Sequence, residues 1–533
     1  MLFTIMEVLL VAMMCCFASV SYVHGLQMVR YQTPAYRNWL AVSHRTLWRE
    51  NVIWAIVGVA LKWYLPMLLS LFITGEQVRS NISNWLVLLL FACVTGWIGR
   101  RDWRMPSAKP FAMTHRVRRL MAVMFVVSAL AGGLMSLLSI PPYFLFAVMA
   151  YVVLLSAWII NPFENRLNAG FYKSAREKIA TRKDLITIGI TGSYGKTNVK
   201  FILRELLSAK YNVLATPASF NTAMGISRVI NDQLRPGHQV FIAEMGATHV
   251  GDIKELVNLV RPKYGILTGI GLRHMDSFGS QANIAGTKYE LIQGLPRNGV
   301  AVFGTGDDYI SRLYAKCDRE KYRISLDENE PAYMTARVIN FGPKGTTFFM
   351  ECENGEKVKC RTRLLGYYSV KNILLAATLA HRMGLTMDEI AEGVRRLQPI
   401  EHHMQLVNEG EVVTIDNSCN EDQDGAFEAV RVLSQMPGHR IILTPGLKDP
   451  AGKDSEANYA LGTVMADCAD AVIIVGERPG VRGLVRGLVQ TGFPNEHIIL
   501  AQDMEEGAAL LHEAIRAGDT VLFEGRIPDY EEY

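Results

Sequence analysis

The sequence lacks the features that mark disulfide-stabilised, zinc-binding and nucleic-acid-binding proteins. It has 8 cysteines in 533 residues, and none of them forms a CxxC pair or another paired metal spacing. We therefore expect free thiols in a reducing compartment. The formal net charge is only +4, so charge alone does not indicate a nucleic-acid partner.

Hydrophobic residues, by contrast, are abundant, and their excess lies almost entirely before residue 160. They make up 50% of the chain, and the mean hydropathy is +0.13. Because a helix needs about 20 apolar residues to cross a bilayer, we predict a transmembrane region of about five helices over residues 1–160. The first stretch has no positive segment before it, which favours a retained anchor over a signal peptide. The apolar stretches are 2–23, 52–73, 85–98, 120–140 and 143–160.

Basic residues alternate between the loops of this region. Two loops are basic, and the other two are nearly uncharged. By the positive-inside rule, this pattern predicts a multi-pass protein of the cell (plasma) membrane with its N-terminus outside and everything after residue 160 in the cytoplasm. The same loops could bind anionic lipid head groups, and residues 161–184 read as a basic juxtamembrane linker. The basic loop residues are Arg30, Arg37, Arg45, Arg49, Arg100, Arg101, Arg104, Lys109, Arg116, Arg118 and Arg119.

A phosphate-binding loop follows the linker. Residues 185–190 read as a buried strand, 191–197 as the loop TGSYGKT, and 198–207 as a helix. Glycines let backbone N–H groups curl around phosphate oxygens, and the helix N-terminus adds positive potential. A glycine falls at 192 and not at 190, which departs from the common spacing. The residues predicted to bind ATP here are Gly192, Ser193, Tyr194, Gly195, Lys196, Thr197 and Asn198.

The segments beyond the loop predict two α/β domains. Strands at 239–245, 264–270 and 300–304 alternate with helices at 252–260 and 284–294, so residues 185–398 should form a P-loop domain with a mostly parallel sheet. Three alternating segments within 333–365 predict an antiparallel insertion. Residues 399–533 repeat the pattern and predict a second, Rossmann-like domain. Glu244 and His274 follow strand ends, where ligands bind in such sheets.

Six motifs in register resemble the Mur ligase family. They are TGSYGKT at 191–197, Asn221-Thr222, Glu244 to His249, His274, Lys288, and Asp416 to Asn420. The likeness covers roughly residues 185–533 and is nearest to the MurF-like branch, which adds D-alanyl-D-alanine to a UDP-MurNAc-tripeptide.

The resemblance implies a role for each matched residue. Lys196 would bind the phosphates of ATP, Thr197 and Glu244 would hold a first Mg²⁺, and His274 a second. Lys288 would carry CO₂ as a carbamate and thereby offer oxygen to the metal. The family also implies an adenine contact at Asn372, an acidic group at Asp416 that closes onto ATP, and substrate contacts at Asn221, Thr222 and His249. The catalytic set is then Lys196, Lys288 and His274.

Each of these residues also has a plain structural interpretation. Glu244 could cap a helix, His274 could be a loop histidine without a metal, and Lys288 an exposed helix lysine. Asn221 and Thr222 could form a simple helix cap, and Asp416 could be a turn residue.

The family resemblance implies an ATP-dependent amide ligase that works through an acyl-phosphate. Its partners would be a nucleotide- or lipid-linked cell-wall precursor, an amino acid or dipeptide, and membrane lipids, with no nucleic acid. Three departures concern the substrate. The membrane helices stand in place of the UDP-sugar domain, His402 and His403 lie where the family often has an arginine, and Glu524-Gly525-Arg526 replaces Lys-Gly-Ser.

Three alternatives stay open at this point. The first is a ligase for another polymer such as poly-γ-glutamate, and the second is a membrane P-loop ATPase or transport subunit. The third is a regulatory pseudoenzyme that binds ATP only. No intramembrane charge pair stands out in the sequence, which counts against transport.

Overall fold

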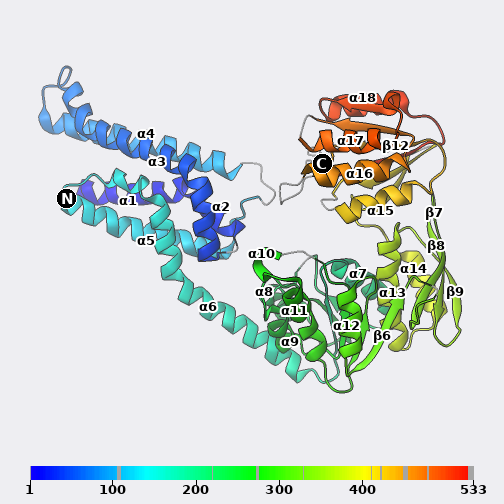
Figure 1. Cartoon of the computed structure of the whole chain (residues 1–533). Coiled ribbons are helices and arrows are strands. Elements are labelled where there is room, and N and C mark those ends of the chain that lie inside the picture. The colour runs from blue at the N-terminus through cyan, green and yellow to red at the C-terminus, as the bar shows by residue number, and fades with distance from the viewer. Residues whose placement is uncertain are drawn as a thin grey trace. The chain divides into compact units, whose positions relative to one another are not determined.

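The structure is a computed structural model, and its described residues form two compact units. The units are Met1–Gly170 and Phe171–Tyr533 (Figure 1). Each unit is described by itself below. The described residues are 2–29, 31–104, 110–218, 220–271, 275–327, 329–409, 411–419, 423–447, 454–476 and 479–525.

The first unit is entirely helical in its described part. Its core is aromatic and aliphatic, with Tyr22, Phe91 and Met124 fully buried. Large apolar side chains also cover its outside, including Trp63 and Trp158, and helices that are apolar all round are typical of membrane spans. All eight tryptophans of the chain lie between positions 39 and 158. The elements are α1 (Leu2–Ala18), α2 (Val20–Met28), α3 (Thr33–Leu69), α4 (Glu76–Trp103), α5 (His115–Leu137), η1 (Pro142–Phe146) and the start of α6 (Met149–Thr181).

Three described helices are long and apolar enough to cross a membrane: Glu50–Leu69, Glu76–Trp103 and His115–Leu137. A fourth span is possible if Phe3–Ala18 and Val20–Met28, which bend by 44° at their junction, act as one. The prediction of about five helices differs from the structure at residues 143–160, which are not one continuous helix. There a short 3-10 helix precedes α6, because the prolines at 141 and 142 interrupt helical hydrogen bonding.

The expectation that no charge pair stands out among the apolar helices was wrong. Glu7 of α1 is 4% exposed and pairs with Lys62 of α3. Glu164 of α6 is 2% exposed and accepts two bonds from Arg119, at 2.6 and 2.9 Å. The partners are 55 and 45 residues apart in the chain, so no local pattern could reveal them.

The predicted linker at 161–184 is mostly helix. It continues α6 to Thr181, and Ala175 and Ile179 are buried in the core of the second unit. Tyr172 donates to the backbone oxygen of Glu255 at 3.1 Å. These two apolar positions, four residues apart, lie on one face of the helix, which explains why a basic segment packs and does not run as a free connection.

The central domain is built on a sheet whose first six strands are parallel. The order is β2-β3-β1-β4-β5-β6-β7-β8-β9, which confirms the parallel sheet and the strand–loop–helix start. The parallel strands are β1 (Ile186–Thr191), β2 (Val213–Ala215), β3 (Val240–Glu244), β4 (Tyr264–Leu267), β5 (Val300–Phe303) and β6 (Glu320–Ser325).

Helices cover both faces of this sheet. One core gathers apolar side chains of α7 (Lys196–Leu207), α13 (Tyr367–Arg382) and α14 (Met387–Arg396). The other gathers those of the helices on the opposite face. These are α8 (Ala223–Gln233), α9 (Asp252–Val260), α10 (Met275–Phe278), α11 (Gln281–Gln293) and α12 (Asp308–Lys316).

The predicted antiparallel segment is present as β7 (Met334–Gly342), β8 (Gly345–Cys352) and β9 (Lys357–Thr362). It extends the central sheet, because β7 pairs in parallel with β6. Phe341 of β7 and the nearby Leu365 belong to the apolar core of the C-terminal domain.

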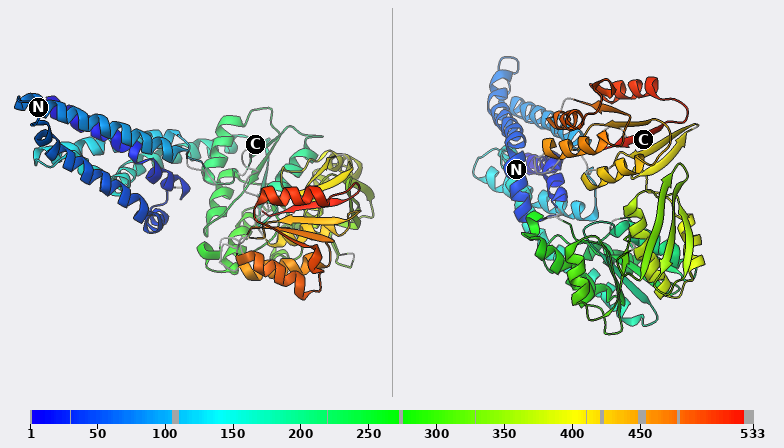
Figure 2. Two further views of the ribbon diagram at one scale, coloured as in Figure 1. Left: turned by 90° about the horizontal axis from the view of Figure 1, so that it is seen from above. Right: turned by 45° about the vertical axis from the view of Figure 1, so that its right-hand side comes forward.

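The C-terminal domain is a second three-layer unit. Its sheet has the order β10-β11-β15-β12-β13-β14, parallel except for β10, which the sequence did not suggest. The views in Figure 2 show this sheet between α18 and the α16–α17 pair. The strands are β10 (Gln405–Glu409), β11 (Val412–Asn417), β12 (Arg440–Thr444), β13 (Ala471–Val475), β14 (Ile498–Ala501) and β15 (Thr520–Glu524). The helices are α15 (Gln423–Leu433), α16 (Asp454–Ala466), α17 (Pro479–Gln490), η2 (Asn495–His497) and α18 (Met504–Ala514).

Candidate active site

The phosphate loop lies between β1 and α7, and two of its glycines have no substitute. Gly192 has φ 151, and a Cβ there would lie 1.9 Å from the Thr268 hydroxyl. Gly195 has φ 75, and its Cβ would lie 2.5 Å from the Asn372 side-chain oxygen. The loop therefore needs glycine both for its backbone conformation and for the neighbours that pack on it.

Two lysines converge on one carbonyl of this loop. Lys196 donates from Nζ to the Gly192 oxygen at 2.8 Å, and Lys288 of α11 donates to the same oxygen at 2.9 Å. Lys288 is 4% exposed, so it is not the exposed helix lysine of the plain interpretation. Burial, followed by the charge of Lys196, lowers the pKa of Lys288 to about 7. An anion such as a phosphate would relieve this concentration of positive charge.

A carboxylate at the end of β3 lies beside the loop. Glu244 is 1% exposed, and its Oε2 accepts from the Thr197 hydroxyl at 2.9 Å and from Lys200 at 2.9 Å. Its Oε1 accepts from Asn221 at 3.0 Å. Sequence reasoning missed Lys200, a fully buried lysine. The only available signal was a cation on an otherwise apolar helix face.

Thr197 and Glu244 offer hydroxyl and carboxylate oxygens, the hard ligands that Mg²⁺ prefers together with phosphate and water. These residues therefore fit a magnesium ion next to the phosphate loop. Among the described residues no group of three or more His, Cys, Asp and Glu side chains could hold a metal by itself. His274, predicted for a second metal, lies outside the described residues.

Ser193 and Tyr194 hold the loop against the segment after β4. The Ser193 hydroxyl accepts from the Gly271 N–H at 2.8 Å, and the Ser193 N–H donates to the Gly269 carbonyl at 2.8 Å. The Tyr194 ring packs where a side chain on Gly269 would stand. These contacts of Ser193 and Tyr194 position the loop, and they do not themselves indicate that either residue binds a phosphate.

A cavity of about 280 Å³ begins at α7, the helix that follows the phosphate loop. It brings together Asn198 and Asn372, two residues predicted to bind ATP, and His403, which stands where the family often has an arginine. Asn372 is 7% exposed and abuts Gly195. Because the cavity starts directly beside the loop, it is placed to receive the base or sugar of a nucleotide. Sequence reasoning missed Phe201 and Arg204, which line its wall.

The three predicted substrate residues lie in different settings. Asn221 reaches Glu244, as described above. The Thr222 hydroxyl accepts from the Gly225 N–H at 3.2 Å and caps α8, which is the plain interpretation of this residue. His249 is exposed, and its backbone N–H donates to Asp252 at 2.8 Å. The structure therefore brings only Asn221 to the phosphate loop.

Asp416 lies at the end of β11 in a different cavity, of about 670 Å³, within the C-terminal domain. Its Oδ2 is 2.7 Å from Nδ1 of His402, and its Oδ1 accepts from the Ser418 N–H at 3.0 Å. The cavity that holds Asn198 and Asn372 does not include it. Its predicted contact with ATP is thus untested by this arrangement.

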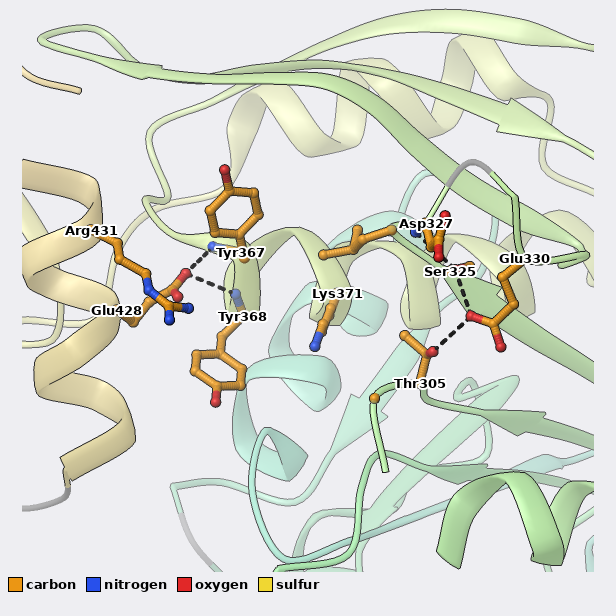
Figure 3. Close-up of a pocket in the computed structure, with 11 residues that line it drawn as sticks. Thr305, Ser325, Asp327, Glu330, Tyr367, Tyr368, Lys371, Glu428 and Arg431 are labelled. Atoms are coloured by element: carbon orange, nitrogen blue, oxygen red, sulfur yellow. Dashed lines mark hydrogen bonds between the residues drawn. The ribbon is translucent and has the colours of Figure 1, made fainter. Parts of the chain in front are cut away.

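A further pocket, here called the cleft pocket, lies where the central and C-terminal domains meet (Figure 3). Its volume is about 410 Å³. Glu428 of α15 crosses from the C-terminal domain and accepts from the backbone N–H groups of Tyr367 and Tyr368 at the start of α13. No motif or spacing in the sequence predicted this pocket. It is lined by Thr305, Gly306, Ser325, Leu326, Asp327, Glu330, Tyr367, Tyr368, Lys371, Glu428 and Arg431.

Comparisons with known proteins agree with this geometry. A family model described as the Mur ligase middle domain matches residues 190–380. The UDP-N-acetylmuramoyl-tripeptide–D-alanyl-D-alanine ligase of Escherichia coli is 30% identical over 295 residues, 55% of this chain and 64% of that enzyme. The enzyme of the same name from Mycobacterium bovis is 26% identical over 358 residues, 63% of this chain and 70% of its own length. The chain thus spans less than two thirds of the E. coli relative.

Solved structures show the same fold. MurF from Thermotoga maritima, crystallised with ADP, has a TM-score of 0.58 at 24% identity, and the match covers 67% of this chain and 80% of that one. A MurF structure from Acinetobacter baumannii has a TM-score of 0.59 at 21% identity, covering 68% and 78%. At these identities the likeness supports a shared α/β fold.

Proposed function

We propose that this chain, which belongs to the Mur ligase family through its middle domain, is an ATP-dependent ligase that makes an amide through an acyl-phosphate. The observation that carries the proposal is the convergence of Lys196 and Lys288 on Gly192, next to the Thr197–Glu244 pair. The Lys196 cation and the oxygens of Thr197 and Glu244 around a glycine loop match a nucleotide triphosphate and its metal.

The chemistry follows in two steps. An acceptor carboxylate attacks the γ-phosphorus of ATP, so a carboxyl-oxygen-to-phosphorus bond forms and the bond to ADP breaks. An amine then attacks the carbonyl carbon, loses a proton and displaces inorganic phosphate. Lys196 would leave the Gly192 carbonyl and offset charge on the transferring phosphoryl group. Magnesium held by Thr197 and Glu244 would neutralise phosphate charge and orient the oxygens.

Lys288 would take part through its neutral form. With a pKa of about 7, a large share of its amine is unprotonated near neutrality. A neutral amine can add to CO₂ and give a carbamate, which offers anionic oxygen to a second metal ion. We propose that Lys288 carries this group in the working enzyme, and that His274 supplies a nitrogen to the same ion.

For the substrates we propose a MurF-like reaction, in which an amino acid or dipeptide is added to a peptidoglycan precursor. The names of the relatives support this choice, because both act on a muramoyl-tripeptide and D-alanyl-D-alanine. Since residues 1–170 form a helical unit outside the matched domain, we propose an acceptor at the membrane, nucleotide- or lipid-linked.

We further propose that the first unit sits in the cell membrane with the ligase domains in the cytoplasm. The basic segments near Arg30–Arg49 and Arg100–Arg119 would face the same side. With the bent α1–α2 pair and the three long helices as four crossings, a fifth crossing through η1 and the start of α6 is required to bring the ligase domains to that side.

The test is turnover by the full chain in detergent with ATP, Mg²⁺ and bicarbonate. UDP-MurNAc-tripeptide, or its lipid-linked form, is supplied with D-alanyl-D-alanine, and ADP and product mass are followed together. A product heavier by one dipeptide, absent in Lys196→Ala, supports the proposal. Product with glutamate as the amine would instead support a poly-γ-glutamate ligase.

Two other outcomes contradict ligation. ADP release that needs neither acceptor nor amine would support a transport ATPase. Tight ATP binding without any turnover would support a regulatory pseudoenzyme.

A further inference from the structure

The cleft pocket has two cations, Lys371 and Arg431, whose charges act on Glu428 without direct contact, and Lys371 also lies 5.6 Å from the centre of the Tyr368 ring. Neither Lys371 nor Arg431 makes a side-chain hydrogen bond or an ion pair within 4.0 Å in the part of the chain that the structure describes. Lys371 lies over the end of β5, because its Nζ is 3.2 Å from the point where Gly306 would carry a Cβ. Figure 3 shows Arg431 on α15, at one end of the pocket, and Lys371 on α13.

The acidic groups of the pocket are largely engaged. Glu330 accepts from Ser325 at 2.8 Å and from Thr305 at 3.2 Å, and it pairs with Arg323 at 3.1 Å. Glu428 accepts from two backbone N–H groups at the N-terminus of α13, where a carboxylate is stabilised by the helix. The pocket therefore offers two cations to a ligand while most of its carboxylates serve the protein.

The cavity proposed for the nucleotide lies on a different side of α13 from the cleft pocket. Asn372 faces the cavity that begins at the phosphate loop, whereas Lys371, the preceding residue, lines the cleft pocket. Consecutive helical residues point about 100° apart, so one helix serves both cavities. The anion in the cleft pocket is thus a different group from the phosphates of ATP.

The pocket lies a short reach from the phosphate loop. β5 is two strands from β1, which is about 10 Å at the usual strand spacing. Both strands are parallel, so their carboxyl ends meet at one edge of the sheet. The rings of Tyr368, in the pocket, and Tyr194, in the loop, are 6.1 Å apart. An extended dipeptide spans about 7 Å, so its carboxyl end can occupy the pocket while its amine faces the loop.

We propose that Lys371 and Arg431 bind the free carboxylate of the incoming amino acid or dipeptide. This inference rests on the proposed ligase function and identifies the part of the site that selects the amine substrate. The pocket holds the end of the substrate that does not react, and the two tyrosine rings border the path from that end toward the acyl-phosphate.

The experiment compares Lys371→Met and Arg431→Met with wild type, using D-alanyl-D-alanine and its C-terminal amide. Each variant is expected to raise KM for the dipeptide about 10-fold or more, as loss of a charged hydrogen bond does. The values of kcat and of KM for ATP should stay within about 3-fold, since neither group contacts the nucleotide cavity. The amide should already have a raised KM in wild type, with little further rise in Lys371→Met.

Lys344→Met is the matched control, because Lys344 is an exposed lysine outside the pocket. Unchanged KM in both pocket variants, or a fall in kcat alone, overturns the inference. So does equal use of dipeptide and amide by wild type.

A binding measurement separates this inference from the ligase proposal. Equilibrium dialysis with labelled D-alanyl-D-alanine, D-alanine and glutamate is run on the full chain with ATP and Mg²⁺. Retention that needs the free carboxylate and Lys371 supports the carboxylate site, and the absence of any product once UDP-MurNAc-tripeptide is added contradicts ligation. Absence of carboxylate-dependent retention for all three compounds overturns the site. Amide product formed without dependence on Lys371 and Arg431 overturns the site and leaves the ligase proposal standing.

Discussion

Two groups of charges, one in the helical unit and one at the phosphate loop of the second unit, are arranged in opposite ways. In the helical unit the buried carboxylates of Glu7 and Glu164 each meet a cation from another helix. In the second unit Lys196 and Lys288 share one carbonyl, and burial, followed by the charge of Lys196, lowers the pKa of Lys288. Paired opposite charges bind helices together, whereas like charges held close mark a place for a ligand of the other sign.

The largest expected effect among the tests of this contrast is that of Lys196→Ala on ATP turnover. Removal of the cation that faces the γ-phosphate should lower ATP turnover by about 10³-fold or more. The fold should persist, since the Lys196 ammonium donates to the loop carbonyls of Gly192 and Ser193 at the surface of the site and not within the apolar core. ADP release and far-ultraviolet circular dichroism measure the two effects. Turnover within about 3-fold of wild type would remove the phosphate loop from the reaction.

The next effect is structural and lies in the other unit. Lys62→Met leaves the buried Glu7 carboxylate without a cation beside it and should destabilise the helical unit by about 3–5 kcal/mol. The double variant Glu7→Gln with Lys62→Met should recover most of this loss, because no buried charge is left. Unfolding in detergent gives both values. Full activity loss in the double variant despite recovered stability would show that the pair acts in function.

A pH series on Lys288 sharpens the contrast. Its amine is protonated below about pH 7 and neutral above, so incorporation of ¹³C-bicarbonate as a carbamate should rise as pH increases through 7. The carbamate signal should be absent in Lys288→Arg. In Lys196→Met the midpoint should move to higher pH, because one cause of the lowered pKa is removed. An unchanged midpoint would mean that burial alone sets it.

The same shift has a consequence for stability with a definite sign. The unfolded lysine titrates near 10.5 and the folded one near 7, so between these values the unfolded chain binds more protons. The stability contributed by this site therefore rises with pH from about 7 to 10.5. Lys288→Met should flatten the pH dependence of the unfolding midpoint in that window.

The smallest expected effect is that of Thr222→Ala. The variant loses the cap of α8 and should cost about 1 kcal/mol of stability, with KM values unchanged. A raised KM for the acceptor would instead show that this hydroxyl binds substrate, as the family resemblance implies. Asn221→Ala is the companion variant, because Asn221 does reach Glu244.

The parts of the fold that depend on local pattern could be predicted. The phosphate loop and α9 follow from short-range periodicity and turn residues, and the predicted helix at 252–260 agrees with α9 in the structure. The strand β6 (EKYRIS) was not predicted, because its alternation consists of only two apolar residues, Tyr322 and Ile324, among charged ones. The predicted linker at 161–184 proved helical because of two apolar positions among many basic ones.

The candidate site likewise contains residues that could be predicted from the sequence and residues that could not. Lys196 and Thr197 follow β1, and Glu244 ends β3, its parallel neighbour in the sheet, so their convergence follows from parallel topology. Lys371 and Arg431 come from different domains, and the pocket between them depends on packing of Phe341 and Leu365 into the C-terminal core. Contacts between residues so far apart in the chain are set by tertiary structure, so the spacing of residues in the sequence does not predict them.

The confinement of every tryptophan to the first 158 residues makes the chain spectroscopically divided. The second unit has tyrosines but no indole, so emission excited at wavelengths that only indole absorbs comes from the helical unit alone. On the proposed function, nucleotide added to the full chain binds in the second unit, which contributes nothing to this signal. A change in indole emission on addition of nucleotide would therefore show that binding in one unit alters the tryptophan environment in the other. An unaltered spectrum would mean that the helices do not respond to the nucleotide.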